Sequence, residues 1–140
     1  EIVLQPGNCQ GSEPVGRRNP GVIYGLGNLV ENAVDFAREK VELSWQWNER
    51  RVELKLVDDG PGYPAEIVDR IGEPYMSRRS PAEGGRGLGL GLFIAKTLLE
   101  RSGASVSFGN SSEPGKGAVV RVTWPREAFL SRTPAAEASY

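Results

Sequence analysis

Histidine is absent from the 140 residues of this sequence. Its absence excludes histidine general bases, histidine metal ligands and histidine phospho-acceptors within the chain. Cysteine occurs once, at Cys9, so no disulfide can form inside the chain. Cys9 stands in a stretch rich in glycine and polar residues, and we interpret it as an ordinary loop thiol rather than a redox sensor. With one cysteine and no histidine, the chain also lacks the usual ligands of a zinc site.

Long hydrophobic runs and an excess of basic charge are also missing. No apolar segment approaches the roughly 20 residues that span a bilayer, and no signal peptide is recognisable. The 17 Lys and Arg nearly balance the 18 Asp and Glu, whereas proteins that bind nucleic acid or anionic membranes need a basic excess. We therefore expect no nucleic-acid partner and no direct membrane contact. The chain begins at Glu1 without methionine, which indicates a fragment of a longer protein.

The hydrophobic pattern predicts one α+β domain. Apolar residues recur every three or four positions after Gly21 and again after Gly91, which predicts two long helices, the second ending at Gly103. Alternating runs at 41–47 and 52–56 predict a β-hairpin, and strands are also expected near 106–108 and 120–124. A short helix is expected over 64–71. This order places a helix layer over a mostly antiparallel sheet.

The ends of the chain and one internal segment show no clear periodicity. We expect a short strand at 1–4, a loop at 5–20, a mobile loop at 76–86 and a weakly ordered tail at 126–140. The chain is therefore divided into an N-terminal strand and loop (1–20), a core (21–125) and a C-terminal tail (126–140).

A glycine-rich element opens the second long helix. Gly87, Gly89 and Gly91 stand where free backbone N–H groups and the helix dipole favour a phosphate. No Lys-Ser or Lys-Thr follows them, as a P-loop requires, and no strand precedes them, as a dinucleotide-binding unit requires. Taken alone, these glycines are equally typical of a flexible loop.

Two further elements offer polar groups at fixed spacing. Asp58-x-Gly60-x-Gly62 ends a predicted strand, where a buried carboxylate could accept from an exocyclic amine; a plain turn explains it equally well. Asn28 and Asn32 lie four residues apart and share one helix face, from which amide oxygens could ligate a hard cation. A solvated helix face is the alternative for this pair.

The three elements occur in an order that resembles the Bergerat ATP-binding fold of gyrase, the ninety-kilodalton heat-shock chaperone, histidine kinases and MutL. Residues 27–33, 57–62, 73–75 and 87–92 look like the N, G1, F and G2 boxes of the kinases. Residues 24–29, 73–77 and 92–96 are similar to the RegB/PrrB group of redox-responsive sensor histidine kinases. The resemblance implies a two-layer α/β sandwich in which three helices cover a mixed, mostly antiparallel sheet, with 21–125 as the ATP-binding catalytic core.

The resemblance also assigns roles. Asn28 and Asn32 become the catalytic pair, with Asn32 as the ligand of Mg²⁺ bridging the ATP phosphates. Asp58 receives the adenine amine, Gly60 and Gly62 shape the base pocket, and residues 76–86 form a lid over ATP. The remaining nucleotide-binding residues belong to the second glycine element and the start of its helix: Arg86, Gly87, Leu88, Gly89, Gly91 and Lys96.

By the same resemblance, the domain transfers the γ-phosphate of ATP to a histidine on a separate dimerisation domain, and from there to a response regulator. Such a domain is cytoplasmic, and its parent protein is anchored in the bacterial inner membrane. Two alternatives stay open: an ATPase or ATP-gated clamp of the gyrase or MutL kind, and a degenerate module that serves as an interaction surface. Asn28 argues against the first, because the hydrolysing branches typically carry a glutamate there, and an amide cannot take a proton.

Two positions depart from the kinase pattern. Asp35 replaces the Lys or Arg that many kinases carry three residues after the Mg²⁺ asparagine. Phosphate charge would then be met by other basic residues, for which the candidates are Arg38, Arg78, Arg79, Arg86 and Lys96. Ala118 replaces a Ser or Thr that follows the last glycine in many relatives, which removes an expected water-mediated contact to adenine.

Overall fold

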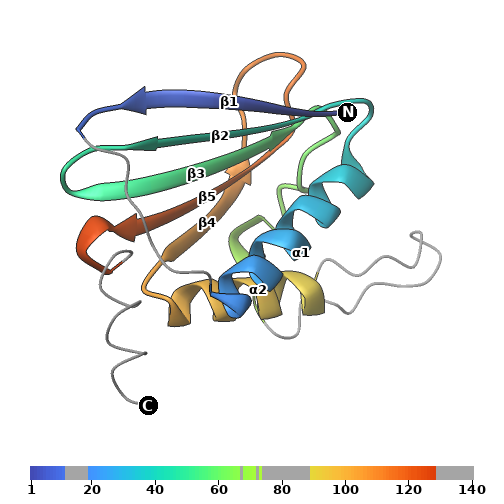
Figure 1. Ribbon diagram of the computed structural model, residues 1–140. Coiled ribbons are helices and arrows are strands. Elements are labelled where there is room, and N and C mark those ends of the chain that lie inside the picture. Colours follow the sequence, from blue (N-terminus) through green and yellow to red (C-terminus); the bar gives the residue numbers. More distant parts are fainter. Residues whose placement is uncertain (12–18, 67, 72, 74–88, 129–140) are drawn as a thin grey trace.

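A five-stranded sheet and two α-helices make up most of the structure, a computed structural model that describes residues 1–11, 19–66, 68–71, 73 and 89–128. The strands are β1 (Ile2–Cys9), β2 (Val41–Trp47), β3 (Arg51–Asp58), β4 (Ser105–Asn110) and β5 (Ala118–Pro125). They lie in the order β1-β2-β3-β5-β4; β1 is parallel to β2, and the other neighbours are antiparallel. Helices α1 (Pro20–Phe36) and α2 (Gly89–Arg101) cover one face, which confirms the two-layer α+β fold (Figure 1).

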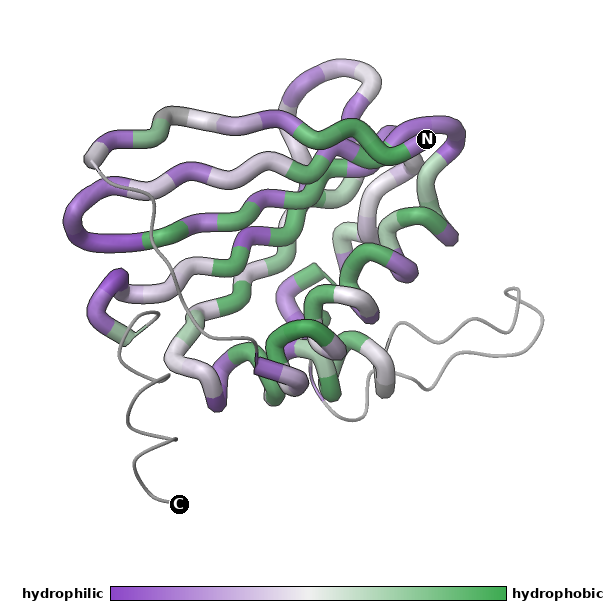
Figure 2. Tube along the Cα trace, viewed as in Figure 1, coloured by the Kyte–Doolittle hydropathy of each residue, from purple (hydrophilic) through white to green (hydrophobic). Residues whose placement is uncertain are grey.

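The core lies between this face and the helices. Hydrophobic residues alternate along β3 and β5, visible as changing colours along the strands in Figure 2, so that one face of the sheet is apolar. Leu56 and Val122 from the sheet are buried with Leu29 of α1 and with Leu92 and Leu99 of α2. Burial of each such side chain stabilises the fold by about 1.5–3 kcal/mol relative to exposure. This core holds the helix layer against the sheet, including β3, which ends at Asp58.

Both α-helices have residues that fix their ends. The Asn19 side chain caps α1 by accepting from the backbone N–H groups of Gly21 and Val22, and Pro20 occupies the first turn. Gly103 ends α2 as predicted, with φ of 101°, and the N–H of Ala104 donates back to the carbonyl of Leu99. In the part of the chain that the structure describes, neither helix is long and apolar enough to cross a membrane.

Two sequence predictions were wrong. The loop predicted from residue 5 begins only after Cys9, because β1 continues to that residue as the edge strand beside β2. An edge strand tolerates Pro6, and the register shifts between Pro6 and Cys9. The helix predicted over 64–71 is present only as a 3-10 turn, η1 (Val68–Arg70), which is the third helical element.

The other strand predictions were confirmed. The β2–β3 hairpin turns at residues 48–50, where the Asn48 side chain accepts from the backbone N–H groups of Arg50 and Arg51. Residues 126–128 are helical, and Arg126 donates from its backbone and its guanidinium to the carbonyls of Arg50 and Asn48. The rest of the predicted tail, the predicted lid at 76–86 and most of the F box lie outside the described residues.

Candidate functional site

Asp58 is a buried carboxylate with one oxygen left to accept. It closes β3, and only 4% of the residue is exposed. Its Oδ1 accepts from the backbone N–H of Gly60 at 2.9 Å and from that of Ala118 at 3.2 Å. Its Oδ2 has no hydrogen-bond donor among the described residues. Because a buried acceptor without a donor is costly, this oxygen is suited to a donor that arrives with a ligand.

Three glycines make room around this carboxylate. A Cβ on Gly60 would collide with the carbonyl oxygen of Phe36, and a Cβ on Gly62, whose φ is 83°, would lie 2.8 Å from Asn110 Oδ1. A Cβ on Gly117 would lie 2.6 Å from Asp58 Oδ1. Gly60 and Gly62 are therefore required by close protein contacts, whereas the motif assigned them to the shape of the base pocket. Gly117 and Asp58 are far apart in the sequence, so only the tertiary structure shows their contact.

Replacement of Gly117 by alanine should damage the site through this contact. The new methyl group must push against the Asp58 carboxylate and the Gly60 carbonyl in a packed region, so we expect destabilisation of about 1–3 kcal/mol. Gly109→Ala is the matched control, because a Cβ at Gly109 on the neighbouring strand meets nothing within 4 Å. Chemical denaturation measures both. Equal stability of the two variants would contradict the steric role of Gly117.

Asp59 ties the start of β2 to the turn after β3. Its carboxylate accepts from the backbone N–H groups of Arg38, Glu39 and Lys40 at distances from 2.7 to 3.2 Å. These bonds, led by that from Glu39, hold the pKa of Asp59 below its usual value of 3.8. Since residues 38–40 follow α1, Asp59 positions the end of α1 beside Asp58. Sequence reasoning missed this residue, although successive carboxylates before Gly-Pro-Gly are a usable signal.

Asp59 should therefore contribute to stability in a pH-dependent way. A carboxyl whose pKa is depressed on folding stabilises the protein above its unfolded value, near 3.8, and loses that contribution as pH falls through the folded pKa. We expect Asp59→Asn to lower the melting temperature at neutral pH, and the gap to wild type to close below about pH 3.8. Thermal unfolding across pH measures this. A gap that is constant with pH would rule out the charged form as the cause.

Asn110 and Tyr63 support the opposite wall of the same turn. The Asn110 side chain accepts from the backbone N–H of Tyr63 at 2.7 Å and donates to its carbonyl at 2.9 Å. The Tyr63 ring is buried and meets Phe108 edge to face, with centroids 6.4 Å apart. Burial, and after it the charge of Asp58, raise the pKa of Tyr63 well above its usual value, so its hydroxyl stays protonated. Both residues fix the backbone that follows Gly62.

Asn28 and Asn32 lie on one flank of α1, between its buried and exposed faces. Gly21 approaches Leu98, and Gly25 approaches Leu99 and the carbonyl of Ala95, so this flank faces α2. These contacts pack the first turns of α1 against the second half of α2, and Figure 1 shows the two helices side by side. Both amides are half-buried, and neither has a hydrogen-bond partner within the described ranges.

The remaining predicted site residues belong to the start of α2. Gly89 is its first residue, and Gly91 is exposed, with nothing within 4 Å of where a Cβ would lie. Packing in the described part of the chain therefore gives no reason for glycine at 91. Lys96 lies 3.9 Å from Glu100, one turn toward the C-terminal end of α2. The last three predicted site residues, Arg86, Gly87 and Leu88, lie outside the described residues.

The fold agrees with comparisons to known proteins. Residues 20–128 match the family model described as histidine kinase-, DNA gyrase B- and HSP90-like ATPase. Over 133 residues the chain is 48% identical to the sensor histidine kinase RegB of Cereibacter sphaeroides, covering 84% of this chain and 29% of RegB. The catalytic domain of histidine kinase ThkA superposes with a TM-score of 0.67 at 22% identity, over 89% of this chain and 79% of that chain.

A full-length histidine kinase, ShkA, solved in complex with AMPPNP, superposes with a TM-score of 0.61 at 28% identity, over 89% of this chain and 25% of that chain. The sequence thus spans less than a third of RegB and corresponds to one domain of such proteins. The family match covers the helices and all strands except β1, and relatives named as sensor histidine kinases align with most of the chain. The chain belongs to the histidine kinase-, DNA gyrase B- and HSP90-like ATPase family and is a catalytic domain of the sensor histidine kinase type.

Proposed function

We propose that this domain binds Mg-ATP and supplies its γ-phosphate to a histidine on a separate dimerisation domain, from which a response regulator is phosphorylated. The observation that carries the proposal is the free Oδ2 of the buried Asp58. Adenine presents an exocyclic amine, a hydrogen-bond donor of the kind that this oxygen lacks. Gly60 and Gly62 let Phe36 and Asn110 pack closely against the turn after β3, which holds the Asp58 carboxylate in place. The AMPPNP bound to ShkA supports a nucleotide as the ligand of this fold.

The phosphates would lie between the later turns of α1 and the start of α2. Free N–H groups at the first turn of α2 favour an anion, and Gly91 lets it approach closely. Asn32 fits a magnesium site, because its amide is half-buried and without a described partner, and Mg²⁺ is commonly held by one or two protein oxygens together with phosphates and water. The described residues contain no acidic or Cys/His cluster that could hold a metal alone. When bound, Mg²⁺ neutralises charge on the phosphates.

The chain's own residues would position the nucleotide rather than react with it. Asn28, beside Asn32, orients polar groups but cannot remove a proton from water. No general base at this position activates water, so ATP hydrolysis does not compete with transfer of the phosphoryl group to the histidine of the partner domain. That domain and the response regulator are partners of the whole protein. By the likeness to RegB, we place the present domain in the cytoplasm and anchor the whole protein in the bacterial inner membrane.

The magnesium assignment is tested by calorimetry of ATP binding with and without Mg²⁺. We expect Mg²⁺ to strengthen binding to the wild-type domain. Asn32→Ala should remove most of that difference, because it deletes the amide oxygen, while binding without Mg²⁺ changes little. Asn48→Ala is a control, since Asn48 lies in the β2–β3 turn. An unaltered Mg²⁺ effect in Asn32→Ala would exclude Asn32 as the ligand.

A further inference from the structure

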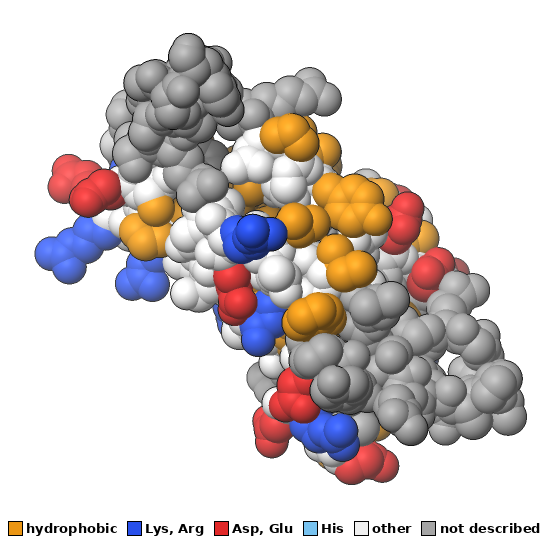
Figure 3. Space-filling view, turned by 90° about the horizontal axis from the view of Figure 1, so that it is seen from below, with side chains coloured by type: hydrophobic (Ala, Val, Ile, Leu, Met, Phe, Trp, Pro, Cys, Tyr) orange, Lys and Arg blue, Asp and Glu red, His pale blue; other side chains and the backbone are white. Residues whose placement is uncertain are grey.

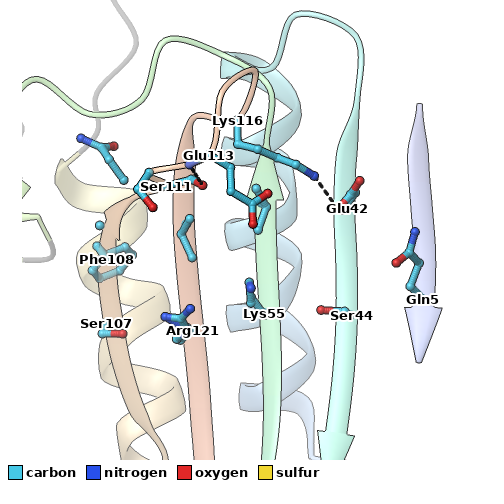
Figure 4. A pocket seen from close by; sticks show the side chains of 15 residues that line it. Gln5, Glu42, Ser44, Lys55, Ser107, Phe108, Ser111, Glu113, Lys116 and Arg121 are labelled. Carbon is cyan, nitrogen blue, oxygen red and sulfur yellow. Dashed lines mark hydrogen bonds and ion pairs between the residues drawn. The ribbon is translucent and has the colours of Figure 1, made fainter. Parts of the chain in front are cut away.

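The face of the sheet opposite the helices is hollowed into a polar cavity of about 480 Å³. The β4–β5 loop rises on this side of the sheet and forms one wall (Figures 1 and 4). From that loop, Lys116 reaches across to Glu42 on β2 and bonds its carboxylate at 3.0 Å. The volume lies within the range of about 300–1,000 Å³ typical of small-molecule sites. The candidate ATP site lies on the helix side, where Asn28 and Asn32 face α2, and it borders the cavity at Asn110, whose side chain bonds the Tyr63 backbone.

One row of polar side chains crosses the floor of this cavity. The strand register places its five members directly opposite one another, one from each strand, in the order Gln5, Ser44, Lys55, Arg121 and Ser107. Figure 4 shows the five side chains at one level of the sheet. Neighbouring strands are about 4.8 Å apart, so each group is within reach of the next. Two cations stand in the centre, and a hydroxyl lies on either side of them.

The central pair carries charge that no group among the described residues neutralises by an ion pair. Lys55 and Arg121 are direct cross-strand partners, an arrangement in which like charges are destabilising. Within the described ranges, neither side chain has an ion-pair or hydrogen-bond partner. Arg121 is exposed and Lys55 is half-buried, so both can meet a ligand. A bound anion would remove this repulsion.

Among the described residues, no carboxylate on this side forms an ion pair with Lys55 or Arg121, although Glu53 lines a neighbouring hollow together with both. Glu42 is held by Lys116 at 3.0 Å and Lys40 at 3.5 Å, and the hydrogen bond from Lys116 in particular keeps the pKa of Glu42 below its usual value. Glu53 accepts from the Gln46 side chain at 2.9 Å. Glu113 lies on the loop wall, above the row in Figure 4. Its charge opposes an anion in the cavity, which gives a variant expected to strengthen binding.

We propose that this row is a second ligand site, which binds the phosphate group of a small molecule. A guanidinium offers paired donors to a phosphate, an ammonium adds a point charge, and the Ser44 and Ser107 hydroxyls can donate to its outer oxygens. The cavity is larger than a phosphate ion needs, so the rest of the ligand lies toward the β4–β5 loop. The proposal is independent of ATP binding and of phosphotransfer.

The test is an NMR titration with inorganic phosphate and, separately, with glycerol 3-phosphate. Both are run at constant ionic strength against chloride, with a non-hydrolysable ATP analogue saturating the other site. We expect shifts centred on the amides of residues 44, 55, 107 and 121. Arg121→Gln should weaken phosphate binding by roughly tenfold or more, since a charge-assisted bond is lost, and Lys55→Gln should act in the same direction. Glu113→Gln should bind more tightly than wild type.

Arg51→Gln is the matched control, because Arg51 lies on β3 four residues from Lys55, on the same side of the sheet and outside the cavity lining. It should bind phosphate as the wild type does. Tighter binding of glycerol 3-phosphate than of inorganic phosphate would support an organic ligand, and equal binding would support phosphate alone. The proposal is overturned if neither probe shifts the row, if chloride produces the same shifts, or if Arg51→Gln weakens binding as much as Arg121→Gln. Thermal unfolding of each variant without phosphate confirms that it is folded.

Discussion

We expect Asp58→Asn to weaken ATP binding by about 10- to 150-fold while the domain stays folded. The asparagine oxygen can replace Oδ1 and still accept from the N–H groups of Gly60 and Ala118, so the turn keeps its hydrogen bonds. The amide nitrogen replaces the free Oδ2 and presents a donor to the adenine amine. Loss of a hydrogen bond to a charged group costs about 1.5–3 kcal/mol, which gives the range stated. Calorimetry with ATP measures the change.

The same variant can be tested for a change of base preference. Inosine triphosphate differs from ATP by an acceptor oxygen in place of the amine, so it suits a donor at position 58. We expect the ratio of ATP to inosine triphosphate affinity to fall in Asp58→Asn, even if both affinities fall. Glu49→Gln is a control, since it removes a carboxylate from the exposed β2–β3 turn, at the opposite end of β3 from Asp58. If ATP affinity is unaltered in Asp58→Asn, the adenine assignment is wrong.

The second large effect concerns what the isolated domain does not do. Incubated with radiolabelled ATP, it should neither label itself nor release phosphate above background. It has no histidine to accept a phosphoryl group, and Asn28 offers no general base. Adding the histidine-bearing domain should allow labelling in trans on histidine, as an acid-labile and base-stable bond. The rate should be low, because a separate domain lacks the millimolar effective concentration that a short tether supplies.

Asn28→Glu is the complementary variant. General-base catalysis contributes about 10²–10⁴-fold, so a glutamate that reaches the attacking water should produce measurable ATP hydrolysis. Asn48→Glu carries the same change to the distant β2–β3 turn and should remain inactive. Robust ATP turnover by the wild-type domain alone would contradict the kinase proposal and favour an ATPase of the gyrase or MutL kind.

Several hydrophobic side chains of α1 are exposed on the helix side. Ile23, Tyr24 and Val34 of α1 are each 46–59% exposed. Figure 3, seen from the helix side, shows hydrophobic side chains gathered there among few charged groups.

Local patterns were sufficient for the main elements. Period-three-and-four spacing predicted α1 to within one residue of its start, and alternation with a three-residue turn predicted the β2–β3 hairpin. Residues 5–9 were assigned to a loop because Pro6 and Gly7 are poor strand formers. Pairing with β2 overrides that preference, since neighbouring hydrogen bonds stabilise an edge strand that its own residues disfavour. The structure has a 3-10 turn at Val68–Arg70 where a helix was predicted over 64–71. No local signal in this segment distinguishes the two.

The order of the motifs determined the family, because each box is a short, local run whose chemistry needs only neighbours in the chain. The sequence alone was therefore enough to propose Asp58, Gly60 and Gly62 as site residues and to place Asn28 and Asn32 on one face of a helix. Only the tertiary structure decided which oxygen of Asp58 stays free, since Oδ1 is taken by the N–H of Ala118, 60 residues away. It also decided that Gly117 abuts this carboxylate and that Lys55 and Arg121 stand opposed across two strands. Such contacts join distant segments through sheet register, which no local pattern specifies.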